Sequence, residues 1–527
     1  MSLSHAKLSK SNHDITHTKL LNDSQSSSQE SISPRSIFAQ CLVTMAVMLS
    51  SASCGMPIGY SAILLPQLKN SNDTLLIDDE IGSWIASVHS AATPLGALLS
   101  GVLMERCGRK SALQISALPL VIGWLLIGFA HNHALILIGR LIAGMSAGLC
   151  AAPGQVLIGE TSEPHVRGIF SSIPFASYSF GILLVYAMGT FLDWRTVAGL
   201  STLLPLFAAI VFFFLPESPV WLVKQQRDQD AKEALIWLRG GDVIQAKQEL
   251  QELVSRVEST DSSDSSTCST WKLLLQPSAL KPFIIINVFN VMQVLSGTYL
   301  IVFYAVDILS SLGQSSEPTI TSVNLTANIT SNLPQNHIDS FLAAVLTAGV
   351  RFTFTIVGTI FLGLMGRRTL ALTSGIGTGI SAIAIAVFLN QNLTSILSSY
   401  AVSVGVLIYV ALNTVGFMIL PGVMIGELYP LRVRGFAGGL TFTFFNFFLF
   451  GVAKCFPFVR KFIGMQGVFW VFGTSSMVAS VFLYLMLPET KGKTLAQIED
   501  YFSGDNLLWV NKAQQKNRRS RSSSENA

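Results

Sequence analysis

The sequence contains a long series of apolar stretches, each of a length that fits the thickness of a lipid bilayer. A helix needs about 20 mainly apolar residues to cross a hydrocarbon core about 30 Å thick. Twelve such stretches lie at residues 37–60, 82–104, 112–130, 134–157, 168–190, 196–215, 283–306, 340–362, 369–390, 396–425, 435–458 and 466–487. They predict an all-α membrane protein with twelve transmembrane helices, and they exclude a chain held by a single anchor.

The composition agrees with this fold class and excludes several functions. Only 12% of the 527 residues are charged and the mean hydropathy is +0.52, which is too apolar for a soluble chain of this size. The six cysteines are scattered, mostly inside the apolar stretches, so we predict neither a disulfide framework nor a metal site. Because no nucleophile motif or metal cluster appears, we expect no enzyme activity, no catalytic residue and no cofactor. We also expect no nucleic-acid partner.

The stretches divide into two groups of six, separated by a hydrophilic segment. We expect a disordered cytoplasmic tail, a six-helix bundle, a cytoplasmic helical loop with a linker, a second six-helix bundle and a cytoplasmic C-terminal tail. These parts cover residues 1–36, 37–216, 217–282, 283–487 and 488–527. Helical spacing from Arg227 to Val257 predicts amphipathic helices, and the Ser-rich acidic run from Asp261 to Thr270 predicts a flexible linker.

The distribution of Lys and Arg predicts the orientation of the chain. Basic residues concentrate after the second, fourth, eighth and tenth stretches, at Arg106, Arg109, Lys110, Arg167, Arg367, Arg368, Arg432 and Arg434. The positive-inside rule then places both termini and the central loop in the cytoplasm. Four glycosylation sequons fall in loops expected to be external, in agreement with this orientation: Asn72, Asn324, Asn328 and Asn392.

The two groups of six share short motifs at matched places. The pairs are the motifs at 108–110 and 366–368, at 159–168 and 426–435, and at 216–218 and 488–490. Their offsets are 258, 267 and 272 residues. Three paired motifs at nearly constant offsets predict two pseudo-symmetric bundles that arose by duplication.

These motifs place Arg and Glu at cytoplasmic helix ends, where they can pair with one another and with helix dipoles. Such pairs would hold an inner gate shut when the bundles close below a solute, and separate when the bundles open. A juxtamembrane Arg can also simply anchor a helix end, but the matched placement in both halves favours the gate. The candidate gating residues are Glu105, Arg106, Gly108, Arg109, Arg140, Glu160, Arg167, Glu217, Arg367, Arg368, Glu427, Arg434 and Glu489.

Several motifs together carry a resemblance to a known family. They are Gly101 to Lys110, Gly139-Arg140, Gly159 to Gly168, Pro216 to Pro219, Leu238-Arg239-Gly240, Gln293 to Gly297, Gly426 to Gly435 and Pro488 to Leu495. From about residue 38 to 502 the chain resembles the sugar porter family of the major facilitator superfamily, most closely the insect facilitated trehalose transporters. The resemblance implies the major facilitator fold, alternating access, and a central polar cavity that binds a sugar by hydrogen bonds and aromatic contacts.

The substrate-site residues that the resemblance implies match the family only in part. Gln293 stands where the family keeps a sugar-contacting glutamine, whereas the Asn-Trp pair of the eleventh helix falls at Phe445 and Asn446, with the amide one place late. Phe175 stands in place of a family glutamine, Tyr299 in place of an asparagine and Gly422 in place of a tryptophan. Ser179 supplies a hydroxyl one turn after Phe175. Both amides could instead form hydrogen bonds between helices, as polar residues in membrane bundles often do.

Arg351 is the most informative departure from the family. It lies within the eighth stretch, where the family usually has a sugar-binding asparagine. A charge at that depth is unfavourable and usually has a partner or a task. Arg351 therefore either binds an anionic or strongly hydrogen-bonding substrate, or pairs with backbone carbonyls or a nearby acid; the sequence leaves both open.

The resemblance also bears on energy coupling. Proton-linked sugar porters carry an Asp directly after a Gly-Tyr pair in the first helix, and here Gly59-Tyr60 is followed by Ser61. The leading hypothesis is facilitative uniport of a sugar, such as trehalose or a hexose, at the plasma membrane. Two alternatives stay open: a carrier of a different small solute, for example an anion, and a sugar sensor that does not transport.

Overall fold

The computed structural model contains only helices and their connections over the residues that it describes. These are residues 34–70, 75, 77–261, 273–306, 308, 340–390, 396–430, 433–491, 498–499 and 501–502. The four predicted glycosylation sites, Asn72, Asn324, Asn328 and Asn392, lie outside them. So do the N-terminal tail up to residue 33 and most of the predicted linker and C-terminal tail.

The first half consists of six membrane-spanning segments. They are α2 (Pro34–Asn70), α3 (Asp79–Cys107), α4 (Arg109–Gly128), α5 (His133–Thr161), α6 (Pro164–Phe191), and the consecutive pair α7 (Trp194–Ser201) and α8 (Leu203–Phe213). Small residues allow close packing of neighbouring helices. A Cβ built at Gly144 of α5 would lie 2.2 Å from the carbonyl oxygen of His89 on α3, so only a glycine fits there.

The second half repeats this arrangement with more irregular helices. They are α13 (Pro277–Leu295), α14 (Leu300–Phe303), α16 (Ser340–Leu364), α17 (Arg367–Asn390), α18 (Ile396–Asn413), the π-helix η1 (Thr414–Met418), α19 (Leu420–Leu428) and α20 (Arg434–Met486). Over the described residues, eleven helical segments are long and apolar enough to span a membrane, and the last is the 53-residue α20. Gly464, with a φ of 69°, divides α20 into two spans, which gives the predicted twelve.

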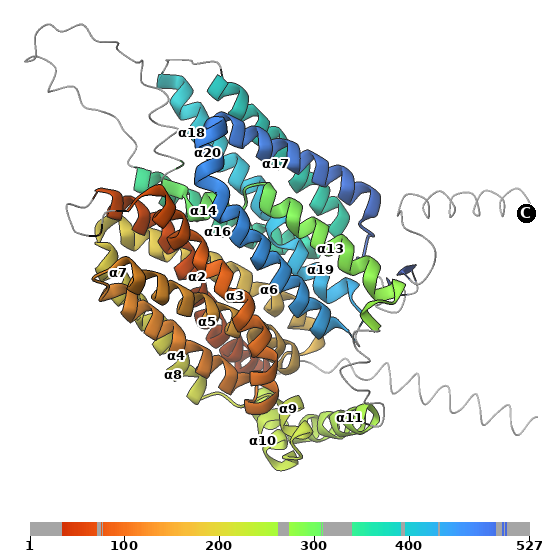
Figure 1. The fold of residues 1–527 in the computed structure, drawn as a ribbon. Coiled ribbons are helices and arrows are strands. Elements are labelled where there is room, and N and C mark those ends of the chain that lie inside the picture. The colour runs from red at the N-terminus through yellow and green to blue at the C-terminus, as the bar shows by residue number, and fades with distance from the viewer. Residues whose placement is uncertain are drawn as a thin grey trace, which may run out of the picture.

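The hydrophilic segment between the halves is a small helical unit of α9 (Pro219–Lys224), α10 (Asp228–Leu238) and α11 (Val243–Asp261). It lies at one end of the first half (Figure 1). We call this end of the molecule the loop side and the opposite end the far side. Arg239 fixes the unit to the membrane helices, because it donates to Glu249 at 2.6 and 2.7 Å and to the carbonyl of Thr161, at the end of α5, at 3.3 Å.

The two halves meet along two helix pairs, since α3 packs on α20 and α6 packs on α16. Figure 1 shows the first half in red to yellow beside the second half in green to blue. Towards the far side, the Tyr186 hydroxyl donates to the carbonyl of Val302 at 2.6 Å, and Lys454 Nζ donates to Ser83 Oγ at 2.8 Å. These bonds join the first half to the second.

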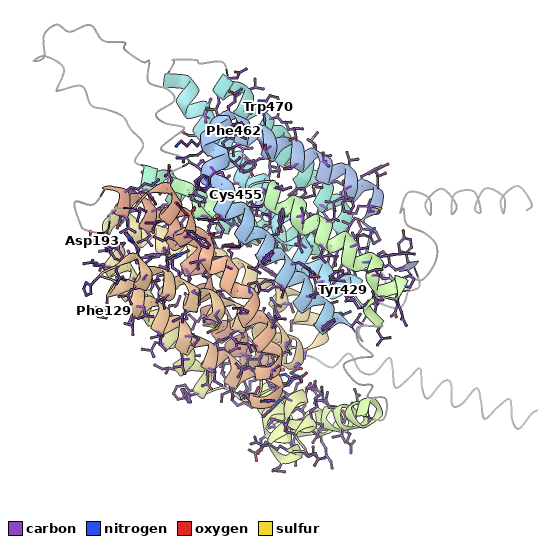
Figure 2. The ribbon with its side chains drawn as sticks, in the orientation of Figure 1. Phe129, Asp193, Tyr429, Cys455, Phe462 and Trp470 are labelled. Atoms are coloured by element: carbon purple, nitrogen blue, oxygen red, sulfur yellow. The ribbon has the colours of Figure 1, made fainter. Side chains whose placement is uncertain are left out.

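Large apolar side chains cover the outside of both halves. Leu118 on α4 is 61% exposed and Ile360 on α16 is 55% exposed. Phe129 and Phe462, labelled in Figure 2, are also exposed. A surface of this kind would be unfavourable in water and fits the hydrocarbon of a bilayer.

Candidate functional site

The seventh span is broken between α13 and α14. Residues 296–299 form the break. Gly297 has a φ of +84°, a backbone region that favours glycine, and a Cβ there would lie 2.5 Å from the ring of Phe472 on α20. This glycine therefore allows both the turn of the chain and its close approach to α20.

Polar side chains satisfy the groups that this break exposes. Ser296 Oγ donates to the carbonyl of Gln293 at 2.7 Å, and Thr298 Oγ1 donates to Asn413 Oδ1 at 2.7 Å. Asn413 Nδ2 donates to Ser296 Oγ at 3.2 Å, and the Tyr409 hydroxyl donates to the carbonyl of Ser296. Because hydrocarbon offers no hydrogen-bond partners, irregular backbone at membrane depth requires such a network.

The tenth span carries a second irregularity beside the first, the π-helix η1. A π-helical turn disturbs the regular pairing of backbone carbonyls. Gln293 Nε2 donates to two of them, those of Phe417 and Met418, at 2.5 and 3.3 Å. The predicted sugar-contacting glutamine thus uses its amide nitrogen to join the seventh span to the tenth. Its amide oxygen accepts no hydrogen bond from any described residue.

Arg351 lies beside the break in the seventh span. Its side chain is buried, and Nη1 donates to the carbonyl of Thr298 at 2.9 Å. The guanidinium carbon lies 5.7 Å from the centre of the Tyr299 ring, which is a cation–π contact. Nε and Nη2 have no hydrogen-bond partner among the described residues. The carbonyl pairing left open by the sequence is therefore present, and it occupies one of the three guanidinium nitrogens.

Aromatic rings complete this region. Tyr299 packs edge-on against Phe445 of α20, with 5.3 Å between ring centres. Asn446 is buried, and its Nδ2 donates to the carbonyl of Phe442 in the same helix at 2.9 Å. Because the amide stands one place later than in the family, the ring of Phe445 faces Tyr299. The amide nitrogen of Asn446 forms its hydrogen bond within its own helix.

The remaining predicted substrate-site residues lie between the halves. Ser179 Oγ on α6 lies 3.2 Å from Thr355 Oγ1 on α16, and Thr355 donates in turn to the carbonyl of Arg351. Phe175, one turn earlier on α6, lies against Gly422 of α19. The structure therefore brings the predicted substrate-site residues together from both halves.

At the loop side of the first half, charged residues form a compact network. Arg109 and Glu160 form an ion pair at 2.9 Å, and Ser218 also donates to Glu160. The Glu217 carboxylate accepts from the backbone N–H groups of Arg109 and Lys110 at 2.9 Å and of Ser218 at 2.8 Å. Glu217 thus caps the N-terminus of α4, where free N–H groups and the helix dipole favour a negative charge.

The second half repeats this network with the matched residues. Arg367 donates to Glu427 at 2.8 Å, and Thr490 donates to the other oxygen of the same carboxylate at 2.5 Å. Glu489 accepts from the backbone N–H groups of Arg367 and Arg368 at 2.9 and 3.2 Å, and so caps α17. Among the motif residues whose side chains the structure describes, each ion pair joins two positions of the same half. The predicted pairing therefore braces each bundle from inside.

Arg140 does not belong to the loop side, contrary to its grouping with the predicted gate. It lies in the first turns of α5, towards the far side, because α5 runs from the far side to the loop side. It is fully buried and donates to the carbonyl of Pro57 at 3.2 Å and to Ser61 Oγ at 2.5 Å. Arg140 therefore ties α5 to α2 inside the first half.

The other predicted gating residues have simpler roles in the described structure. Glu105 and Arg106 are exposed, and the carbonyl of Glu105 accepts from Trp221 Nε1 at 2.9 Å. Arg434 donates to the carbonyl of Tyr429 at 3.2 Å, across the turn before α20. Gly108 has a φ of +95° and packs on Glu217. The side chain of Arg167 lies outside the described part of the chain.

Comparison with known families agrees with this architecture. Residues 42–502 match the family model described as sugar (and other) transporter. The chain belongs to this family. It is 31% identical over 471 residues to the facilitated trehalose transporter Tret1 of Culex quinquefasciatus, covering 89% of this chain and 86% of the relative. It is 31% identical over 476 residues to the Anopheles gambiae protein of the same name, covering 89% of this chain.

This chain spans about half the length of several of these relatives, since it covers 57% of the Anopheles gambiae protein and 48% of the one from Drosophila grimshawi. Among solved structures, it matches the partially occluded, inward-open conformation of the xylose transporter XylE from E. coli. That match has a TM-score of 0.68 and 18% identity, and it covers 86% of this chain and 99% of XylE. The likeness confirms the predicted major facilitator fold.

Sequence reasoning missed several polar residues of the site. Asn413 bridges the two broken spans, and Tyr178, Tyr186 and Tyr409 lie around Arg351. Asn413 could have been found, because it is the one amide within the apolar run of the tenth span. The tyrosines gave no such signal, since a tyrosine in an apolar stretch can equally well lie at the membrane interface.

Proposed function

We propose that this protein is a facilitative sugar carrier that works by alternating access, with trehalose or a hexose as the substrate. The observation that carries the proposal is the meeting of two broken spans of the second half, the seventh and the tenth, beside residues of the first half such as Ser179 and Tyr186. Broken helices near mid-membrane are where transporters of this kind bind polar solutes. Family membership supports sugar as the solute class.

The groups beside the break suit a polyhydroxylated ligand. The free amide oxygen of Gln293 can accept from a sugar hydroxyl, and the rings of Tyr299 and Phe445 offer apolar faces for a pyranose. A polar ligand in a dry site must have its hydrogen bonds replaced, since each one left unmade costs about 1–3 kcal/mol. Gln293 would thus both stabilise the tenth span and bind substrate.

The surroundings of Arg140 support uniport. In the structure its partners in the first span are the carbonyl of Pro57 and the hydroxyl of Ser61. A serine hydroxyl does not ionise near neutral pH, so this pair offers no carboxylate that could load and release a proton. We therefore propose transport down the gradient of the sugar itself.

The orientation and the domain limits belong to the same proposal. The loop side would face the cytoplasm, together with both termini, and the far side would face the exterior of a plasma membrane. This follows from the basic residues at the loop side and the sequons at 72, 324, 328 and 392. The bundles would comprise residues 37–216 and 283–487.

Counterflow in proteoliposomes tests the proposal. Vesicles preloaded with trehalose or glucose should accumulate the labelled sugar at equal internal and external pH, and collapse of any pH gradient should leave the rate unchanged. A Gln293→Leu variant should lose most exchange. Gln114→Leu is a matched control and should keep wild-type exchange. Gln114 also donates to a backbone carbonyl of a neighbouring helix, that of Ala209, but both residues lie away from the site.

Two outcomes would contradict the proposal. Folded protein that exchanges neither sugar would show that the altered pocket no longer carries sugars. Sugar binding without exchange, detected for instance as a ligand-dependent rise in Tm, would instead favour a sensor.

A further inference from the structure

Arg351 is a buried cation near the centre of the molecule. Its exposed fraction is 4%, and it lies midway along α16, which spans Ser340–Leu364. Among the carboxylates that the structure describes, none forms an ion pair with it, and the titratable side chains around it are tyrosines. An uncompensated charge at this depth is strongly unfavourable, so a negative charge from outside the described chain would stabilise it.

Comparison with the other buried arginines shows that Arg351 is unusual. Arg239 holds both oxygens of Glu249, and Arg109 is paired with Glu160. Arg140 has no acid, but both of its terminal nitrogens donate. Arg351 alone among these four has two guanidinium nitrogens, Nε and Nη2, without a partner in the described structure.

The identity of these two nitrogens is informative. Nε–H and one Nη2–H lie side by side along one edge of the guanidinium plane, and this edge matches the two oxygens of a carboxylate. The third nitrogen, Nη1, is held by the carbonyl of Thr298, which fixes the plane of the group. The edge that binds carboxylates is thus the edge that the protein leaves without a partner.

Two further donors lie in the same region. Tyr178 on α6 and Tyr299 at the break are partly exposed; Tyr299 is in cation–π contact with Arg351, and Tyr178 lies in the same region. Their hydroxyls form no hydrogen bond with any described residue. By contrast, the hydroxyls of Tyr186 and Tyr409 already donate to backbone carbonyls. The region therefore presents an excess of free donors, drawn from both halves.

We propose that the carried solute is a sugar acid, a hexuronate or an aldonate, whose carboxylate binds side-on to Nε and Nη2 of Arg351. Tyr178 and Tyr299 donate to the same carboxylate or to its neighbouring hydroxyl. This inference rests on the proposed carrier function and replaces the neutral sugar named there with a sugar acid. Because uniport of such a solute moves one negative charge per cycle, its rate depends on membrane potential.

The experiment uses the full-length protein in proteoliposomes, with labelled glucose and labelled glucuronate as separate substrates. The neutral methyl ester of glucuronate is the matched competitor, since it keeps the shape of the sugar but removes the charge. Glucuronate should exchange, and should compete about 10- to 100-fold more strongly than its ester, the range expected for charge-assisted hydrogen bonds. A potassium diffusion potential, positive inside, should accelerate glucuronate entry. These arms need only the wild-type protein.

Variants assign the effect to the arginine. Arg351→Gln should remove the preference for glucuronate over its ester, and Arg351→Lys should retain part of it, because Lys keeps the charge but not the planar edge. Arg195→Gln is a matched control. Arg195 also combines one carbonyl, that of Ala130, with one ring, that of Trp194, but lies at the far side. This control should keep the wild-type preference.

The following results would overturn the sugar-acid proposal. If glucose exchanges while glucuronate neither exchanges nor competes, the sugar-acid proposal is overturned and the sugar carrier stands. If neither is exchanged by folded protein, both proposals fail. If glucose exchange requires chloride, a free anion is the partner of Arg351 and the proposal fails. An unchanged preference in Arg351→Gln would also overturn it.

Discussion

The ring of Phe175 lies against Gly422, so that a Cβ at position 422 would stand 3.0 Å from the ring carbon Cζ. Phe175 comes from the fifth span and Gly422 from the tenth, where the sugar porters that this chain resembles carry a glutamine and a tryptophan, respectively. We infer that the aromatic side chain from one half fills the space that the family's tryptophan takes in the other, so that the two departures compensate each other.

This compensation predicts the behaviour of a pair of variants. Gly422→Trp should reduce counterflow strongly and lower the Tm, because overpacking a tight contact costs about 1–3 kcal/mol. Adding Phe175→Ala should restore much of both, since it removes the ring that the new indole meets. Additive losses in the double variant would show that the two positions are independent.

The contact between Arg140 and Ser61 predicts how sugar transport could be made dependent on a proton. Ser61→Asp places a carboxylate beside the guanidinium, which lies 2.5 Å from the present hydroxyl. We expect wild-type exchange not to depend on pH, because neither Ser61 nor Arg140 titrates near neutral pH. Ser61→Asp exchange should change as the pH falls through the pKa of the new acid, which burial raises and the guanidinium lowers. Ser61→Asn, a neutral variant of the same shape, should behave like wild type. A pH-dependent wild type would contradict the uniport proposal.

The far-side contact between Lys454 and Trp84 predicts a shift in the conformational balance. Lys454 Nζ lies 4.1 Å from the centre of the Trp84 ring and also donates to Ser83, so it holds α20 against α3. Lys454→Gln should favour opening of the far side about fivefold, because a cation–π contact contributes about 1 kcal/mol.

A small cleft between the two halves at the far side is lined by Leu65, Tyr304 and Pro457. A cysteine at position 65 therefore reports this opening. The exposed Cys107 and Cys455 would first be replaced by Ser. The labelling rate should rise in Lys454→Gln. It should stay unchanged in Arg460→Gln, which removes a cation lining the same cleft. Equal rates in both variants would show that the Lys454 contact does not hold the far side closed.

The two capping carboxylates predict matched losses of stability. Glu217→Ala and Glu489→Ala each remove an acceptor from several backbone N–H groups, at the starts of α4 and α17. Loss of a helix cap costs about 0.5–2 kcal/mol, so both variants should have a lower Tm in detergent. The Tm of Glu489→Gln should lie between those of the wild type and Glu489→Ala, since glutamine keeps one acceptor oxygen but carries no charge. Glu233→Ala, an exposed acid on α10, should leave the Tm unchanged.

Much of the fold could be predicted from the sequence. Hydrocarbon requires each span to satisfy its own backbone, so apolar length alone defined the helices. The repeated motifs at 108–110 and 366–368 predicted the two halves. The described spans differ from the prediction in their breaks, because the seventh is interrupted between α13 and α14 and the tenth contains the π-helix η1.

The site was predicted less completely, and the residues show why. Gln293 was selected for contact with sugar, but the structure shows that its amide nitrogen pairs with the carbonyls of Phe417 and Met418. Those carbonyls need a partner because the tenth span contains a π-helical turn, which no sequence pattern indicated. Arg140 was grouped with the gating charges because it belongs to a family motif, although its place at the start of the fourth stretch already set it at the opposite end from them.

The sequence by itself determined that this protein lies in a lipid bilayer, where its helices are and that it consists of two repeated halves. These properties depend on apolar length, spacing and repetition along the chain. Only the tertiary structure decided which groups meet. The contact of Phe175 with Gly422, and the two unpartnered nitrogens of Arg351, depend on how spans from different halves pack side by side. Hydrogen bonds and packing act between neighbours in space, and residues far apart in the chain become neighbours only after the helices have packed.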